Sequence, residues 1–187
     1  KNYKDAITYF INYLTLANDD AKKRSAVLRI ADCHFVNKTY WSALSFYNKI
    51  IKENKGQVDY ALYQKALSYG FLGKNDQKIK TLQKIQNQFK ISAYLDKSYF
   101  ALGNIFANKG QNTDALAAYD DLIFMYPKSP LVAKAKLKTG IILFNTNNYK
   151  GSINVLKRIV ADYPGTSEAV QAVNMAEQVY KELGQVD

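Results

Sequence analysis

Residues 99–127 read YFALGNIFANKGQNTDALAAYDDLIFMYP, and this stretch decides the fold. Its hydrophobic spacing predicts two short amphipathic helices joined by a tight turn at KGQN. Small residues, Gly103 and Ala115, lie where the two helices would touch, and large ones such as Tyr119 need a neighbour to cover them. A hairpin of this kind cannot bury both of its apolar faces alone, so we expect it to recur along the chain.

The pattern returns every 35 to 37 residues. The equivalents of Gly103 are Ala31, Ala66 and Gly140, and the equivalents of Ala115 are Ala6, Ala43, Lys78 and Ser152. One helical hairpin per period of this length is typical of an α-solenoid. Lys78 stands where a small residue is expected, so we predict that its stem reaches toward solvent or that its hairpin is looser.

The order of residues resembles the tetratricopeptide repeat (TPR) family. The matching positions are Leu102, Gly103 and Phe106 in the first helix (helix A), Ala115 and Tyr119 in the second (helix B), and Pro127 after it. The copy that ends at Pro164 keeps the frame but has lost the aromatic residues. The resemblance covers the whole chain and implies an all-α fold, a right-handed TPR superhelix (solenoid) of about ten antiparallel helices in roughly five pairs.

We predict one solenoid over residues 1–187. Its hairpin units span approximately 20–54, 57–89, 92–127 and 129–163, with half-repeats at 1–17 and 167–187. Both ends fall in the turn between helices A and B, since Lys1 and Gly184 are the equivalents of Gly110. We therefore expect the chain to be an excerpt of a longer repeat array.

Local signals predict where several helices begin and which way they face. The segments Asn18-Asp19-Asp20 and Thr166-Ser167-Glu168 are expected to cap the helices that follow them, and Ser129 followed by Pro130 predicts a helix whose N-cap is the serine. In the helix that begins near Thr39, Trp41 is expected to face inward together with Leu44, Tyr47, Ile50 and Ile51.

Composition favours a protein without nucleic-acid specificity. The net charge is +10, but only three of the 26 basic residues are arginine, and the lysines are spread along the chain. The densest group, Lys74, Lys78, Lys80 and Lys84, is interpreted as a solvated helix face; a basic module that binds DNA or RNA is the alternative. No apolar run approaches the roughly 18–20 residues that a transmembrane helix needs.

The sequence offers no catalytic or metal-binding constellation, so we predict a protein that is not an enzyme and needs no cofactor. His34 is the only histidine, and we interpret it as a packing residue, with an enzyme that uses His34 as the alternative. Cys33 precedes it and would point about 100° away around a helix, which argues against a Cys–His dyad. The carboxylate pair Asp19–Asp20 suits a helix start, and the pair Asp120–Asp121 suits a solvated face.

The resemblance implies a concave wall lined by the first helix of each hairpin, where TPR proteins usually bind peptides. The candidate groove residues by register are Asp32 and Phe35; Tyr63 and Leu67; Phe100, Asn104 and Asn108; and Ile141, Phe144 and Asn145. The same spacings also pack helices together, so core and groove roles both stay open. The lysine–asparagine clamp that some TPR domains use for a C-terminal carboxylate is absent, since only Asn104 falls on such a position.

A second resemblance concerns the links between repeats. The boundaries YPKSP (126–130) and YPGTS (163–167), with repeats of 37 residues, look like those of bacterial envelope TPR proteins, which include outer-membrane assembly lipoproteins and the periplasmic partner of the Tol–Pal system. The motif also occurs in cytoplasmic TPR proteins. We expect a non-catalytic scaffold that binds a peptide or partner protein in a bacterial multiprotein assembly, with the periplasm or envelope as its compartment; the cytoplasm stays open, as do the partner and the oligomeric state.

Overall fold

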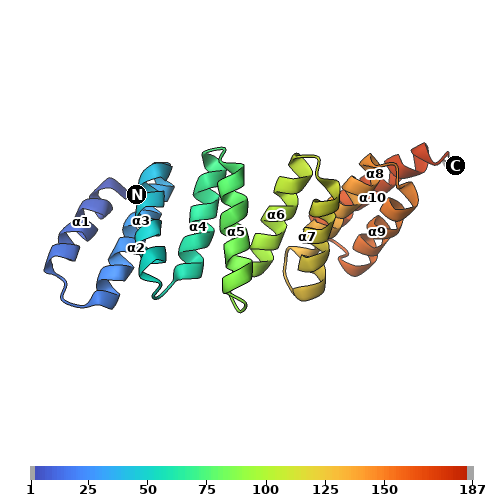
Figure 1. The fold of residues 1–187 in the computed structure, drawn as a ribbon. Coiled ribbons are helices and arrows are strands. Elements are labelled where there is room, and N and C mark those ends of the chain that lie inside the picture. Colours follow the sequence, from blue (N-terminus) through green and yellow to red (C-terminus); the bar gives the residue numbers. More distant parts are fainter. Residues whose placement is uncertain (1–2, 185–187) are drawn as a thin grey trace. The chain divides into compact units, whose positions relative to one another are not determined.

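The computed structural model describes residues 3–184 and forms ten α-helices over that range (Figure 1). The helices are α1 (Tyr3–Leu16), α2 (Asp20–Val36), α3 (Tyr40–Glu53), α4 (Val58–Phe71), α5 (Asn75–Gln88), α6 (Leu95–Asn108), α7 (Asn112–Met125), α8 (Val132–Asn145), α9 (Tyr149–Asp162) and α10 (Ser167–Glu182). No strand occurs among these residues. The predicted all-α fold of about ten helices is therefore confirmed.

The chain forms two compact units, which divide between Ser98 and Tyr99 inside α6. In the first unit, each of the helices α1 to α4 packs against the next one along the chain. Its core is a buried cluster of small and large residues from α2, α3 and α4: Leu28, Ala31, Ala43, Tyr47, Ile50 and Ala61. The small residues allow the helix axes to approach, and Tyr47 fills the space between them.

In the second unit, α7 packs on α8, α8 on α9 and α9 on α10. Tyr119 and Leu156 are fully buried and occupy equivalent positions in successive hairpins. Gly103 explains how Tyr119 fits, because a Cβ atom at residue 103 would lie only 2.4 Å from Cε1 of the Tyr119 ring. The small-against-large arrangement predicted from residues 99–127 is thus the actual contact between α6 and α7.

One turn position has the same backbone conformation in every hairpin. Lys38, Gly73, Gly110, Asn147 and Gly184 all follow the first helix of a pair, and all have φ between 60° and 72°. A residue with left-handed backbone angles just after a helix allows the following N–H groups to bond to the last carbonyls of that helix, and glycine adopts these angles without steric cost. The repeat period seen in the sequence is therefore also a period of backbone geometry. Lys1, predicted to occupy the same slot, lies outside the described residues, as do residues 185–187 of the last half-repeat.

Several local expectations are confirmed. Asp19 accepts hydrogen bonds from the backbone N–H groups of Ala21 and Lys22, and these bonds lower the pKa of its carboxyl group. The hydroxyl of Thr166 accepts one from the N–H of Ala169 at 3.2 Å. These two residues cap α2 and α10 as predicted.

Two local expectations are wrong. Trp41 does not face inward but is 63% exposed, because Ala43, Leu44 and Tyr47 already cover the inner face of α3. The helix predicted to begin at Pro130 begins at Val132, and the Ser129 hydroxyl instead accepts a bond from the N–H of Leu131 in the preceding turn. No helix in the described range is long and apolar enough to cross a bilayer.

Candidate interaction surface

A cluster of tyrosine rings lies on α4 and on the turn before α6 in the first unit. Tyr63, a predicted groove residue, stacks on Tyr94 with 5.1 Å between ring centroids, and Tyr60 approaches the same ring at 5.8 Å. The Lys97 ammonium lies 5.2 Å from the centroid of the Tyr94 ring. All three tyrosines keep partial contact with solvent. We call Tyr60, Tyr63 and Tyr94 the tyrosine cluster.

Asp32, also predicted to line the groove, holds the first unit together. Its Oδ1 accepts hydrogen bonds from the hydroxyls of Tyr47 and Tyr60, each at 2.9 Å, and its Oδ2 lies 3.5 Å from Arg29. Burial, together with this carboxylate, raises the pKa of Tyr60 to about 12 and raises that of Tyr47 as well. Asp32 thus ties α2 to α3 and α4, and most of its acceptor capacity is already used.

Phe35 lies in an aromatic group at the end of α2. Its ring meets those of Tyr40 and Phe71 edge-on, each at 5.7 Å, and Tyr40 stacks on Phe71 at 4.8 Å. Phe71 is 64% exposed, so this group presents an aromatic surface that the register argument missed.

Leu67 lines a small cavity between α4 and α5. The cavity has a volume of about 220 Å³ and is bounded by Leu67, Gly70, Phe71, Asn75 and Lys78. Lys78 is half-buried with its stem against α4, whereas Lys74, Lys80 and Lys84 are exposed. The predicted lysine-rich face therefore lacks one of its four members.

In the second unit, Asn104 and Phe100 contact the buried ring of Tyr119. The Asn104 Oδ1 accepts a hydrogen bond from the Tyr119 hydroxyl at 2.8 Å, and the ring centroids of Phe100 and Tyr119 are 5.9 Å apart. Burial raises the pKa of Tyr119 to about 12. Asn104 therefore has its carbonyl engaged inside the repeat, while Asn108, one turn later, is exposed.

Ile141 and Phe144 on α8 are shared between surface and core. Both are half-buried and pack against the cluster formed by α8, α9 and α10, and Phe144 also meets Tyr149 at 5.6 Å. Asn145, at the last residue of α8, is exposed. Of the predicted residues in the second unit, Asn108 and Asn145 have the most side-chain surface free for a partner.

His34 has a packing environment. Its Nδ1 lies 2.9 Å from the Thr39 hydroxyl, and its ring stacks on Phe46 at 5.4 Å. Burial lowers the pKa of the imidazole and raises that of the neighbouring Cys33 thiol. A raised thiol pKa makes a poor nucleophile. Within residues 3–184, no group of three or more histidine, cysteine or acidic side chains is arranged to hold a metal ion.

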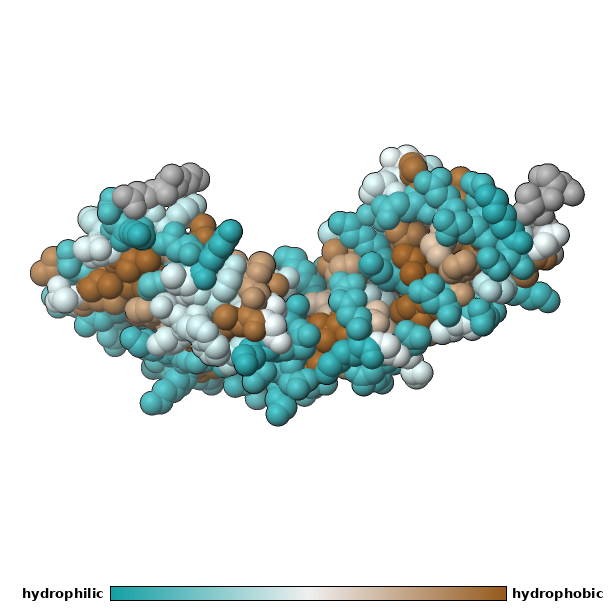
Figure 2. Space-filling view, turned by 90° about the horizontal axis from the view of Figure 1, so that it is seen from above, coloured by the Kyte–Doolittle hydropathy of each residue, from teal (hydrophilic) through white to brown (hydrophobic). Residues whose placement is uncertain are grey.

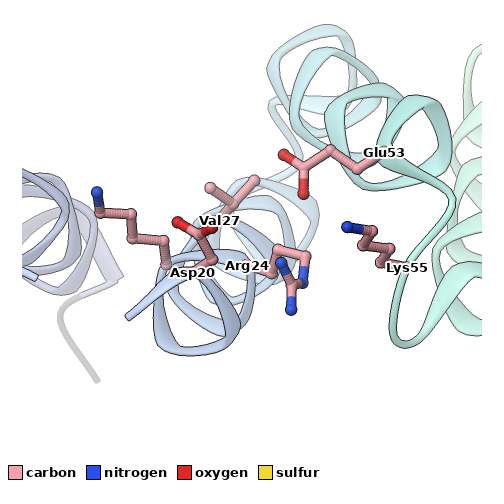
Figure 3. A pocket seen from close by; sticks show the side chains of 6 residues that line it. Asp20, Arg24, Val27, Glu53 and Lys55 are labelled. Carbon is pink, nitrogen blue, oxygen red and sulfur yellow. The ribbon is translucent and has the colours of Figure 1, made fainter. Parts of the chain in front are cut away.

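A charged pocket of about 300 Å³ lies between the start of α2 and the end of α3, and sequence reasoning missed it. Figure 3 shows Asp20, Arg24 and Val27 on α2 facing Glu53 and Lys55, and Lys23 completes the lining. Three cations oppose two carboxylates there, so the pocket carries little net charge. Val27 is the one apolar residue among the six that line it.

Apolar surface is also exposed on α1 and on α9 and α10. Tyr9 and Leu16 of α1 are 72% and 78% exposed, and brown patches mark this helix at the left of Figure 2. Between α9 and α10, an apolar pocket of about 450 Å³ is lined by Leu156, Lys157, Val160, Val173, Ala176, Glu177 and Tyr180. Both regions belong to single helices or hairpins rather than to the predicted groove positions.

Similar folds occur among solved structures. The MamA protein is 18% identical with a TM-score of 0.70, over 87% of this chain and 83% of that one. YrrB, described as a TPR protein with an unusual peptide-binding site, is 17% identical with a TM-score of 0.67, over 92% and 84%. BtubC (BKLC) from P. vanneervenii is 15% identical with a TM-score of 0.75, over 99% and 85%. No curated protein sequence matches the chain.

Family models also match the chain itself. Two models, each described as tetratricopeptide repeat, match residues 60–90 and residues 100–166. The matched ranges include α5 and α7 to α9 in full, together with most of α4 and α6. The repeat frame, the small-against-large contact of Gly103 with Tyr119 and these matches agree: the chain is an all-α protein built from tetratricopeptide repeats.

Proposed function

We propose that the chain is a non-catalytic scaffold that binds a peptide or a partner protein through the solvent-facing side of α4 and the turn before α6. The observation that carries this proposal is the tyrosine cluster. Tyr63 stacks on Tyr94, Tyr60 meets Tyr94 in a tilted arrangement, and Tyr60 is also held by its hydrogen bond to Asp32. Each ring still keeps part of its surface in solvent. Rigid, half-exposed aromatic rings lose little conformational entropy on binding and are frequent hot spots in interfaces.

The surroundings of the tyrosine cluster favour an extended peptide. Tyrosine hydroxyls and amide side chains can bond to a peptide backbone, while the ring faces cover its apolar side chains. The solved TPR protein YrrB is described as having a peptide-binding site, which is compatible with this use of the fold.

The proposal can be tested with peptides selected from a random display library on the purified chain. Tyr63→Ala should weaken the best selected peptide at least tenfold in fluorescence anisotropy, because it removes one ring of the tyrosine cluster. Trp41→Ala is the matched control, since Trp41 is an equally large ring exposed on α3. Circular dichroism should show unchanged helix content in both variants. Equal affinities for the wild type and Tyr63→Ala would refute the assignment of the surface.

We further propose that this scaffold acts in a bacterial multiprotein assembly at the envelope or in the periplasm. The support is the pair of boundary sequences YPKSP and YPGTS, which resemble those of bacterial envelope TPR proteins. Fractionation of the source cells, followed by immunodetection, tests the compartment. Recovery in the cytoplasmic fraction alone would refute the envelope assignment and leave the binding proposal intact.

A further inference from the structure

Lys78 occupies a position that is small and fully buried in neighbouring hairpins. Its equivalents Ala43, Ala115 and Ser152 are each 0% exposed, at the point where the second helix of a pair touches the first. Lys78 is longer than this contact allows, and its side chain continues across α4 at Gly70. A Cβ atom at residue 70 would lie 3.0 Å from the Lys78 Nζ, 3.3 Å from its Cδ and 3.4 Å from its Cε.

Gly70 is the counterpart that makes this path possible. The equivalent residues in the other hairpins, Phe35, Ala107 and Phe144, all carry a side chain. Glycine is a poorer helix former than alanine, and here the space that a side chain at residue 70 would fill is taken by the lysine stem. The two departures from the repeat thus compensate each other, and they deliver an ammonium group to the face of α4 that carries Leu67.

The ammonium group has no acceptor among the described residues. Burial lowers the pKa of Lys78, and no carboxylate contributes to that shift. Lys65, on the neighbouring helix, shows the contrasting case, since its Nζ donates to the side-chain Oδ1 of Asn48 at 2.7 Å. A partly desolvated cation without a partner gains more from an incoming anion than an exposed lysine does.

The cavity beside Lys78 is suited to a carboxylate attached to an apolar group. Among the residues that line its 220 Å³, Lys78 and Asn75 have side chains that can donate hydrogen bonds, and Leu67 and Phe71 are apolar. This mixture of one cation, one amide and two apolar side chains resembles the usual composition of a small-ligand site. Phosphate, which is more strongly hydrated and has no apolar part, would leave the Leu67 and Phe71 side unfilled.

We propose that Lys78 and Asn75 bind a carboxylate group of a peptide ligand, with the adjacent apolar side chain of that peptide against Leu67 and Phe71. The carboxylate comes either from the C-terminus of the ligand or from an aspartate or glutamate side chain. This subsite rests on the proposed peptide-binding function, because Leu67 belongs to the predicted ligand-binding face. It adds a chemical requirement that the tyrosine cluster does not impose.

The test is an NMR titration of the ¹⁵N-labelled chain with three small probes. N-acetyl-leucine carries a main-chain carboxylate, the α-amide of N-acetyl-leucyl-aspartic acid carries a side-chain carboxylate, and N-acetyl-leucinamide carries none. We expect saturable shifts of the Gly70, Phe71 and Lys78 amides with at least one acid, and at least fivefold weaker binding of the amide. Whichever acid binds more tightly identifies the source of the carboxylate. Sodium acetate and sodium phosphate complete the series. Equal shifts of these amides with both salts would mean that the site takes an adventitious ion only.

Two variants separate the subsite from simple charge. Lys78→Met keeps the aliphatic stem, and Gly70→Ala keeps the charge but displaces the ammonium; each should weaken the acid probe at least fivefold. Lys80→Met, which removes an exposed lysine from the same helix, is the matched control and should bind like the wild type. The amide spectrum of each variant reports whether it folds.

Three outcomes would overturn the subsite. The acid and amide probes could bind equally well; folded Lys78→Met and folded Gly70→Ala could both bind the acid probe as tightly as the wild type; or Lys80→Met could lose as much affinity for the acid probe as Lys78→Met does. If the acid probes fail while Tyr63→Ala still weakens a selected peptide, the subsite is wrong and the proposed function stands. If the acid probes bind but no peptide is ever selected, the site accepts carboxylates and the peptide-binding function is wrong.

Discussion

Replacing Gly103 with alanine should destabilise the second unit although alanine is the better helix former. The added Cβ would lie 2.4 Å from Cε1, 2.7 Å from Cδ1 and 2.8 Å from Cζ of Tyr119. The ring cannot easily move away, because it is fully buried and its hydroxyl is bonded to Asn104 on the same helix as Gly103. Either the ring or the axis of α6 must shift.

The magnitude follows from three opposing contributions. Overpacking a core position costs about 1–3 kcal/mol, and loss of the Tyr119–Asn104 hydrogen bond, if the ring shifts, costs about 1 kcal/mol. Against this, alanine gains about 1 kcal/mol over glycine inside a helix. The net expectation is a loss of about 1–3 kcal/mol in the free energy of unfolding.

The repeat supplies a matched control at Gly140. There the new Cβ would lie 3.0 Å from Cδ2 and 3.3 Å from Cγ of Leu156, and 4.0 Å from Cγ1 of Val155, which is an ordinary contact. Leucine can adjust its side chain by a few tenths of an ångström, so the helix-propensity gain should offset the contact. Gly140→Ala should therefore change stability by less than about 1 kcal/mol. The same substitution in the same repeat position thus has two different expected outcomes.

Urea denaturation followed by circular dichroism measures both variants, and native-state hydrogen exchange localises the effect to α6 and α7. Repeat proteins can unfold in parts, so exchange guards against a misleading single transition. Adding Tyr119→Leu to Gly103→Ala reproduces the alanine–leucine pair that Gly140→Ala forms with Leu156, and it should recover stability relative to the sum of the single changes. The reasoning is refuted if Gly103→Ala is as stable as Gly140→Ala, or if the double variant shows no favourable coupling.

Three further predictions concern the first unit. Lys38→Gly should raise the free energy of unfolding by up to about 1 kcal/mol in urea denaturation, because residue 38 has φ of 60°; a loss of stability would contradict the turn argument. Asp32→Ala should cost about 1–3 kcal/mol by leaving the buried Tyr47 hydroxyl unpaired, while Asp32→Asn, which retains an acceptor oxygen, should cost less; equal losses would exclude the hydrogen bond as the cause. Burial lowers the pKa of His34 below its usual 6.5, so the unfolded chain takes up this proton first as the pH falls. The free energy of unfolding should therefore fall as the pH drops below about 6.5 and level off below the pKa of the folded state. His34→Gln should remove that part of the pH dependence in acid titrations of the unfolding midpoint.

Sequence spacing predicted the repeat because each hairpin must meet the same packing requirement. Gly103 and Tyr119 are informative in sequence since their sizes are complementary at a fixed separation. The direction of Trp41 was not predictable in this way, because apolar spacing leaves a wide stripe and the inner face of α3 was already filled by smaller neighbours. The start of α8 was misplaced for a different reason: serine followed by proline initiates turns as readily as helices, and here it forms the turn.

The candidate site was harder to predict than the fold because register places a residue on a face but does not reveal its partners. Register assigned Asp32 and Asn104 to the groove, but it did not reveal that their oxygens accept hydrogen bonds from tyrosines about fifteen residues later in the sequence, in the next helix. Tyr63 was named from register alone, but its stacking partner Tyr94 lies in an irregular turn outside the helical pattern. Polar pairing of this kind depends on side-chain reach, which sequence spacing does not encode.

The small position of the second helix offers a way to change the ligand-facing surface without changing the fold. In one hairpin that position is Ser152, whose hydroxyl donates to the Gly140 carbonyl at 2.8 Å and stays within the contact. In another it is Lys78, which passes through the contact and emerges beside Leu67 because residue 70 is glycine. Since each repeat contacts only its neighbours, such a pair of substitutions alters one site and leaves the other hairpins intact. Two repeat positions should therefore be considered together. One lies four residues after the small residue of the first helix and is Gly70 here; the other is the small position of the second helix and is Lys78 here. A long polar side chain at the position of Lys78 predicts a polar group at the surface only when the position of Gly70 is also glycine.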